Sequence, residues 1–189
     1  MAGKKVTGIT TMYMDEGLDT GDIIMQKEIS IEDDMDHGTL ESVLAESGAD
    51  LLLDTLKVLE NGSAVRIPQD NSKASYAQMI TRDDEIISWS HSAETVHNTI
   101  RALCPKPGAY TTIAENKIKI FKSRVVNTNG NGVVGQINSL TSEGFVVQTG
   151  AGLLEILEIQ KAGKKRMSSS DFLKGFKLEP GTLIGDQGI

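Results

Sequence analysis

Acidic side chains and glycines alternate in the segment 14–26, which reads MDEGLDTGDIIMQ. The acids are Asp15, Glu16, Asp19 and Asp22. Carboxylates in such a cluster bind cations or take part in catalysis. Apolar, β-prone runs flank the segment at residues 6–14 and 23–31, so the pattern predicts a β-hairpin with a polar tip. That tip holds Asp19 out of the sheet on a short loop.

Three interpretations of the tip compete: an ordinary acidic turn, a calcium loop and a catalytic carboxylate. Asp and Gly are common in turns, so the first needs no function. A calcium loop of the EF-hand type starting at Asp15 would need a ligand at its third position, Gly at its sixth and Glu at its twelfth. Those positions hold Gly17, Thr20 and Gln26, which excludes that loop type. Spacing alone leaves the acidic turn and the catalytic carboxylate open.

Several separated motifs follow one another in a specific order from about residue 6 to about residue 185. They are TGITTM (7–12), MDEGLDTGDI (14–23), RIPQ (66–69), KASYA (73–77), WS (89–90), IRAL (100–103), PKPGAY (105–110), GKKRMS (163–168), DF (171–172) and PG (180–181). In this order the motifs resemble the methionyl-tRNA formyltransferase family. Their number makes the resemblance far more specific than a single short pattern would be.

The resemblance implies transfer of a formyl group from 10-formyltetrahydrofolate to the α-amino group of methionine on initiator tRNA, without a metal. It aligns Asp19 with the family's catalytic Asp, which pairs with a catalytic His. The neighbouring positions would shape the substrate loop: Gly17, Leu18, Thr20, Gly21 and Asp22. The partners implied are initiator methionyl-tRNA and the folate co-substrate.

The family's catalytic Asn-x-His and its Ser-Leu-Leu-Pro folate segment precede the Asp19 loop, and neither occurs in this sequence. We therefore expect the C-terminal portion of the enzyme, cut inside the catalytic domain and inactive alone. We also expect self-association through the apolar faces that the missing sheet would cover. Two alternatives stay open: a non-catalytic tRNA-binding module and an amino-sugar formyltransferase relative.

Charge is distributed unevenly along the chain. The net charge is −9 over residues 1–80 and +2 over residues 81–189, within a total of −7. Lys117 and Lys119 alternate with isoleucines, as on a solvated strand face. In the family, positive residues of the C-terminal domain face tRNA, whose phosphates attract Lys and Arg. The candidate tRNA contacts are Arg101, Lys106, Lys164, Lys165 and Arg166. Several related sequences carry an aromatic residue in place of Lys106.

Hydrophobic periodicity predicts a helix from Thr39, as N-cap, to residue 60, with its leucines on one broad face. A second helix is expected at 92–103 and a short one near Ser169 or Ser170. Short strands are expected at 110–113, 117–126, 133–138, 145–148 and 153–160.

The fold class is then α/β plus β. Residues 1–63 would be the end of a Rossmann-like formyltransferase domain, a β-hairpin plus helix. Residues 64–82 would be a linker, and residues 83–189 a small OB-like β-barrel that binds tRNA. The single cysteine, Cys104, is expected to be buried. The sequence shows no signal peptide and no apolar run of about 20 residues, which favours a cytoplasmic protein that does not bind membranes.

Overall fold

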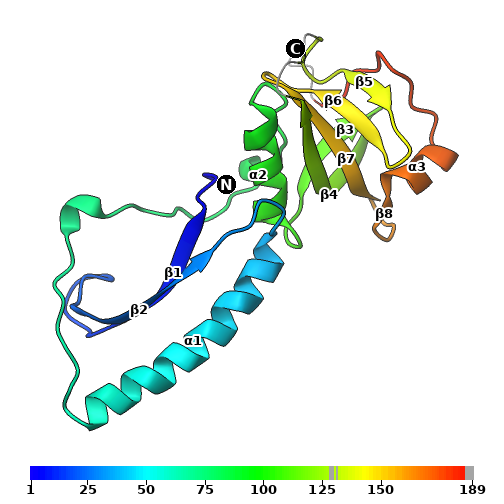
Figure 1. Cartoon of the computed structure of the whole chain (residues 1–189). Coiled ribbons are helices and arrows are strands. Elements are labelled where there is room, and N and C mark those ends of the chain that lie inside the picture. The colour runs from blue at the N-terminus through cyan, green and yellow to red at the C-terminus, as the bar shows by residue number, and fades with distance from the viewer. Residues whose placement is uncertain (128–129, 131, 186–189) are drawn as a thin grey trace. The chain divides into compact units, whose positions relative to one another are not determined.

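The computed structural model describes residues 1–127, 130 and 132–185, which form two compact units (Figure 1). One unit runs from Lys4 to Met79. The other holds residues 1–3 and the chain from Ile80 onward.

The first unit is a β-hairpin with one long helix packed against it. Strands β1 (Val6–Met12) and β2 (Ile23–Ser30) pair antiparallel, and the register shifts near Thr11, where the strands approach the acidic loop. The helix α1 (His37–Glu60) runs along the hairpin (Figure 1). The predicted strands are confirmed, except that both end before their last predicted residues.

The predicted N-cap of α1 is wrong. The helix begins at His37, and the carboxylate of Asp36 accepts a hydrogen bond from the Thr39 amide at 2.8 Å. Thr39 is thus the third helical residue, the one whose N–H group the cap satisfies. Asp is among the preferred N-cap residues, and it caps as well as Thr or better. At the other end, the Asn61 amide donates to the Lys57 carbonyl.

Only one stripe of α1 faces the hairpin. Leu51 and Thr55 are buried there, and the Thr55 hydroxyl lies 2.8 Å from that of Thr11 on β1. Leu52 and Leu56, predicted on the same broad face, remain 53% and 52% exposed. Two strands are too narrow to cover a wide apolar face, so these leucines lie on the uncovered apolar face that the sequence led us to expect.

The second unit, called the barrel below, is an antiparallel sheet with the strand order β3-β4-β7-β6-β5, and β8 pairs with β7. Its strands are β3 (Ala109–Ile113), β4 (Asn116–Asn127), β5 (Ile137–Leu140), β6 (Phe145–Gln148), β7 (Leu153–Lys161) and β8 (Met167–Ser168). Its helices are α2 (Ala93–Leu103) and α3 (Ser169–Gly175), preceded by the short 3-10 turn Asp83–Glu85. Residues from α2, α3 and five strands share one hydrophobic core. The predicted fold class is confirmed.

Two details of the barrel differ from the prediction. The strand expected at 133–138 lies at Ile137–Leu140, because Gly135 has a positive φ of 78° and the Gln136 amide turns back to the Val133 carbonyl. The two-residue strand β8 was not predicted, since so short a run carries no periodicity. The short helix near Ser169 is confirmed, with the Ser168 hydroxyl accepting from the Asp171 amide as its N-cap.

The single tryptophan and the single cysteine both lie inside the barrel unit. Trp89 is buried, and its indole N–H donates to the Thr111 hydroxyl at 3.0 Å. Cys104 is buried at the end of α2, as expected. None of the helices in the described ranges is long and apolar enough to cross a membrane.

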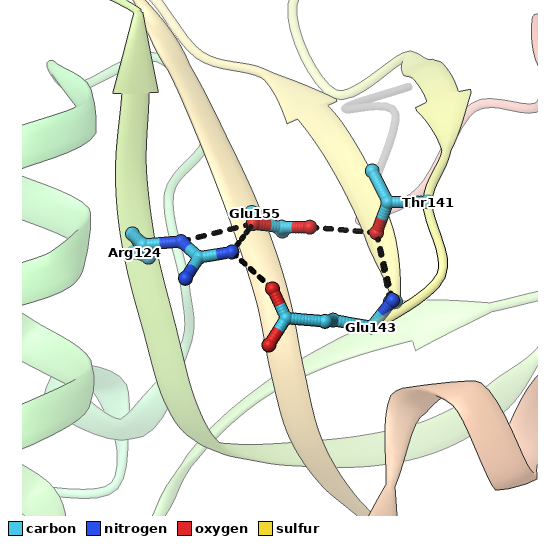
Figure 2. Close-up of polar contacts among 5 residues, drawn as sticks. Arg124, Thr141, Glu143 and Glu155 are labelled. Atoms are coloured by element: carbon cyan, nitrogen blue, oxygen red, sulfur yellow. Dashed lines mark hydrogen bonds and ion pairs between the residues drawn. The ribbon is translucent and has the colours of Figure 1, made fainter.

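A polar network ties β4, β7 and the β5–β6 turn together (Figure 2). The buried carboxylate of Glu155 accepts hydrogen bonds from Arg124 at 2.6 Å and from the Thr141 hydroxyl at 2.6 Å. Glu143 shares the Arg124 guanidinium. Burial raises the pKa of Glu155, but the hydrogen bonds from Thr141 and Arg124 and the charge of Arg124 outweigh it. The pKa of this carboxyl therefore lies below its ordinary value.

Candidate functional site

The acidic loop between β1 and β2 is folded by its own side chains. One carboxylate oxygen of Asp15 accepts hydrogen bonds from the Gly17 amide at 3.0 Å and from the Thr20 hydroxyl at 2.7 Å. A Cβ atom on Gly17 would lie 2.1 Å from that hydroxyl oxygen, so the tight approach requires glycine. These contacts bring both ends of the Gly17–Thr20 tip toward one acceptor.

Asp19 stands at the tip in a left-handed conformation, with φ of 56°. Few residues other than Gly adopt this region, although Asp and Asn do so more readily than most. Its carbonyl accepts a hydrogen bond from the Gln69 side chain at 2.9 Å. Among the described residues, its carboxylate makes no hydrogen bond or ion pair, and it is exposed. The backbone of Asp19 is fixed while its carboxylate stays available to another group.

The loop is braced by the segment 66–69, which the sequence placed in a linker. The backbones of Ile23 and Ile67 exchange two hydrogen bonds of 2.8 and 3.0 Å. The side-chain amide of Gln69, which donates to the Asp19 carbonyl, also donates to the Gly21 carbonyl at 2.7 Å. A Cβ atom on Gly21 would lie 1.7 Å from the Tyr13 carbonyl oxygen, so this position also needs glycine.

Asp22 and Leu18 have contrasting environments within the loop. Asp22 pairs with Arg66 at 3.3 Å, and the same guanidinium lies 3.8 Å above the Tyr13 ring. Leu18, in contrast, is 87% exposed. Asp22 therefore supports the loop, whereas Leu18 presents an apolar surface beside Asp19.

Neither unit shows a metal site in the ranges that the structure describes, where no three His, Cys, Asp or Glu side chains gather closely enough to hold an ion. At the tip of the loop, Asp19 offers an accessible carboxylate. Such a group can accept a hydrogen bond from a cationic partner and stabilise its charge.

A second candidate region lies in the barrel, where two loops carry cations. The loop after α2 holds exposed Lys106 between Pro105 and Pro107, and the turn after β7 holds Lys164, Lys165 and Arg166, all exposed. The Arg166 guanidinium donates to the Pro105 carbonyl at 2.9 Å, which joins the two loops.

Lysines on the adjoining strands extend this basic surface. Lys117 lies 3.3 Å above the Tyr110 ring, and Lys119 donates to the Pro107 carbonyl. Together with Lys161 they line a shallow pocket of about 160 Å³ that reaches Gly163 in the turn. The sequence placed Lys117 and Lys119 on a solvated strand face, and the structure adds that this face adjoins the cationic turn.

Arg101 has a different environment on α2. It is half-buried, and its Nε donates to the Asn98 side chain at 2.8 Å. Burial, followed by the charge of Arg101, lowers the pKa of the Met1 amino group. These contacts give Arg101 a structural environment that the exposed lysines of the two loops do not share.

Known proteins match this chain along nearly all of its length. The family described as "Formyl transferase, C-terminal domain" matches residues 79–177, and the family described as "Formyl transferase" matches residues 1–56. The chain belongs to the formyl transferase family.

Curated relatives make the same connection more closely. A protein named methionyl-tRNA formyltransferase from Syntrophomonas wolfei is 55% identical over 99% of this chain and 60% of its own length. One of the same name from Carboxydothermus hydrogenoformans is 48% identical over 98% of this chain and 59% of its own length. The chain thus spans about 60% of the length of these relatives. The family resemblance read from the sequence is confirmed.

A solved structure shares the fold. A HypX variant from Aquifex aeolicus has a TM-score of 0.66 and 19% identity, covering 94% of this chain and 32% of its own. At that identity the likeness concerns the fold alone.

Sequence reasoning missed the supporting roles of Arg66 and Gln69 in this formyl transferase chain. The signal was present, because RIPQ was one of the motifs that carry the family resemblance, but the low periodicity of its surroundings favoured a linker. The structure shows that this segment contacts the acidic loop.

Proposed function

We propose that this chain is part of a methionyl-tRNA formyltransferase. The whole enzyme would transfer a formyl group from 10-formyltetrahydrofolate to the α-amino group of initiator methionyl-tRNA, and would act in the cytoplasm during translation initiation. The observation that carries this proposal is the 55% identity, over 99% of the chain, with a protein of that name.

The proposed reaction begins when the amine attacks the formyl carbon. Negative charge then develops on the former carbonyl oxygen, and catalysis needs hydrogen-bond donors aimed at that oxygen and a group to manage the amine proton. We assign Asp19 as the carboxylate that pairs with a catalytic histidine of the complete domain. A carboxylate beside an imidazole favours its charged form and raises the histidine's pKa. The accessible Asp19 carboxylate, on a braced backbone, supports this role.

The remaining loop residues would shape the substrate site around Asp19. Gly17 and Gly21 allow the close backbone approaches that the loop requires. Thr20 and Asp22 are engaged in holding the loop, through Asp15 and Arg66 respectively. Leu18 is free to contact substrate through its exposed apolar side chain.

The barrel would contact the tRNA through its basic surface. We assign residues 83–189 as the tRNA-binding domain, residues 1–63 as the end of the catalytic domain and residues 64–82 as the segment between them. Exposed lysines can approach phosphates without being buried, and each contact releases counterions, so binding should weaken with salt. Lys106, Lys164 and Lys165 fit this role best, and half-buried Arg101 fits it least.

The first experiment measures tRNA binding and formylation by this 189-residue chain, after circular dichroism shows that it is folded. We expect salt-dependent tRNA binding without turnover, and weaker binding by a Lys164→Ser, Lys165→Ser variant. Lys57→Ser removes a cation from α1 and should leave tRNA binding unchanged. Turnover by the chain itself would contradict the need for the family's Asn and His, whereas absence of tRNA binding would contradict the barrel's assignment.

The second experiment places Asp19→Asn in a protein that carries this segment behind a complete catalytic domain. The amide keeps the size of the side chain but removes the charge, so formylation of methionyl-tRNA should be abolished. Near-full activity of this variant would contradict the assignment of Asp19. An assay of the unsubstituted protein with a nucleotide-linked amino sugar in place of methionyl-tRNA separates the proposal from the amino-sugar alternative.

A further inference from the structure

We propose that Arg166 is a positioning residue, which holds the loop 104–108 so that Lys106 meets an RNA phosphate beside Lys164 and Lys165. The inference rests on the proposed tRNA binding by the barrel. It changes the expected role of Arg166, which the sequence placed among the direct contacts.

The Arg166 side chain is already engaged by the protein. Its guanidinium carbon lies 3.5 Å from the centre of the Phe121 ring, and one of its N–H groups donates to the Pro105 carbonyl at 2.9 Å. Phe121 belongs to β4 and is only 6% exposed, so the ring is a fixed platform. Stacking and a directed hydrogen bond together are a use of Arg that Lys cannot reproduce.

The loop is held at a second carbonyl as well. The Lys119 ammonium donates to the Pro107 carbonyl, on the other side of Lys106. Gly108 closes the loop with a φ of 85°, its amide donates to the Leu103 carbonyl at 2.8 Å, and a Cβ atom there would lie 2.8 Å from the Phe121 ring. The same aromatic ring thus contacts both Arg166 and the end of the loop.

These contacts leave Lys106 as the exposed cation between two anchored carbonyls. A cation on a fixed backbone loses less conformational entropy when it binds than one on a free loop. Arg166, in contrast, already donates to a carbonyl and stacks on a ring. Its loss should therefore affect RNA binding chiefly through Lys106.

The test is a double-mutant cycle with Lys106→Met and Arg166→Met, measured as tRNA affinity over a series of salt concentrations. Each single variant should reduce the slope of log affinity against log salt by about one, the effect of one lost phosphate contact. The double variant should show the same slope as either single variant, because both changes remove the same phosphate contact, that of Lys106. A slope lower by about two, with multiplying losses of affinity, would show that Arg166 contacts RNA itself and would overturn the proposal.

Arg166→Lys keeps the charge but loses the stacked geometry, and it should weaken binding nearly as much as Arg166→Met. Full affinity in this variant would also overturn the proposal. A measurement without RNA guards against misfolding and against failure of the proposed function. Hydrogen exchange of the Gly108 amide, which donates to the Leu103 carbonyl, should accelerate in both Arg166 variants but stay unchanged in Lys165→Met, with Trp89 fluorescence reporting the intact barrel. If the unsubstituted chain binds no tRNA, the proposed function fails, and unchanged loop exchange separately refutes the positioning role.

Discussion

The hairpin unit and the barrel unit place their candidate residues by different physical means. In the hairpin unit the buried hydrophobic residues among those described are Ile24 and Leu51, while the barrel buries residues from two helices and five strands in one core. The acidic loop depends on hydrogen bonds that the Asp15 carboxylate accepts and that the Gln69 side chain donates. The basic loops of the barrel instead contact β4, whose inward-facing residues belong to the hydrophobic core.

This difference shows that a loop can be well defined within a weakly packed unit. Hydrogen bonds contribute about 1 kcal/mol each, whereas burial of a large apolar side chain contributes several times as much. The loop of Asp19 should therefore loosen after small local changes, and the barrel should respond mainly to changes in its core. The following substitutions test that contrast, in order of decreasing effect.

The largest effect is expected from Phe145→Ala in the barrel core. Phe145 is fully buried on β6, and loss of its ring should destabilise the barrel by about 3–5 kcal/mol. Leu52→Ala removes an exposed side chain from α1 and should cost far less. Urea denaturation followed by Trp89 fluorescence measures the first, and helix circular dichroism measures the second. Equal losses of stability would contradict the proposed contrast between the units.

Glu155→Gln should destabilise the barrel by about 1–3 kcal/mol, because it leaves buried hydrogen-bonding groups mismatched. The pKa of Glu155 in the folded barrel lies below its ordinary value of 4.5. At acidic pH this side chain therefore binds more protons in the unfolded chain than in the folded one. The stabilisation is complete above about pH 4.5 and is lost as the pH falls through the lowered pKa.

Unfolding measured from pH 6 to pH 3 should show a weaker pH dependence in Glu155→Gln than in the unsubstituted chain. Glu143→Gln, which changes an exposed neighbour on the same Arg124, provides the matched control and should alter the profile little. An unchanged profile in Glu155→Gln would show that other carboxyl groups dominate the acid response.

Asp36→Ala should cost about 1 kcal/mol of α1 stability, because it removes the N-cap. Thr39→Ala is the matched control, since the structure assigns Thr39 the capped amide and gives its side chain no capping role. Helix content during thermal unfolding compares the two variants. A larger loss in Thr39→Ala would restore the N-cap that the sequence predicted.

The smallest global effect is expected from Gln69→Ala, which removes two hydrogen bonds to loop carbonyls. Its consequence should be local, with faster amide exchange at residues 17–22 and a change of about 1 kcal/mol in local opening. Gln26→Ala removes a comparable amide from β2, where it bonds Thr10, and should leave loop exchange unchanged. Equal exchange in both variants would mean that the Gln69 bonds do not hold the loop.

The sequence predicted the features that local chemistry determines. Gly17, Gly21 and the flanking β-prone runs were sufficient to place the hairpin and to expose Asp19. The contact between Gln69 and Gly21 spans 48 residues, and nothing in local periodicity reports such a distance. The role of Arg166 was hidden for a similar reason, because its partners Pro105 and Phe121 are remote in sequence.

One further error has a local cause. Val133 and Val134 look like strand residues, but the positive φ of Gly135 turns the chain before the strand begins. The exposed leucines of α1 agree with the expectation that part of its apolar face would be uncovered, since the hairpin supplies two strands. The apolar pattern therefore indicated each element correctly and misplaced the start of one strand.

The length of α1 determines where the chain after the helix meets the acidic loop. Ile23 and Ile67 are joined by backbone hydrogen bonds, and the 24-residue helix lies between them in sequence. Deleting one residue inside the helix would shorten it by about 1.5 Å and turn everything beyond it by about 100°. Gln69 would then point away from the carbonyls it holds, although no residue of the loop had changed. The helix should accordingly tolerate substitutions far better than insertions or deletions.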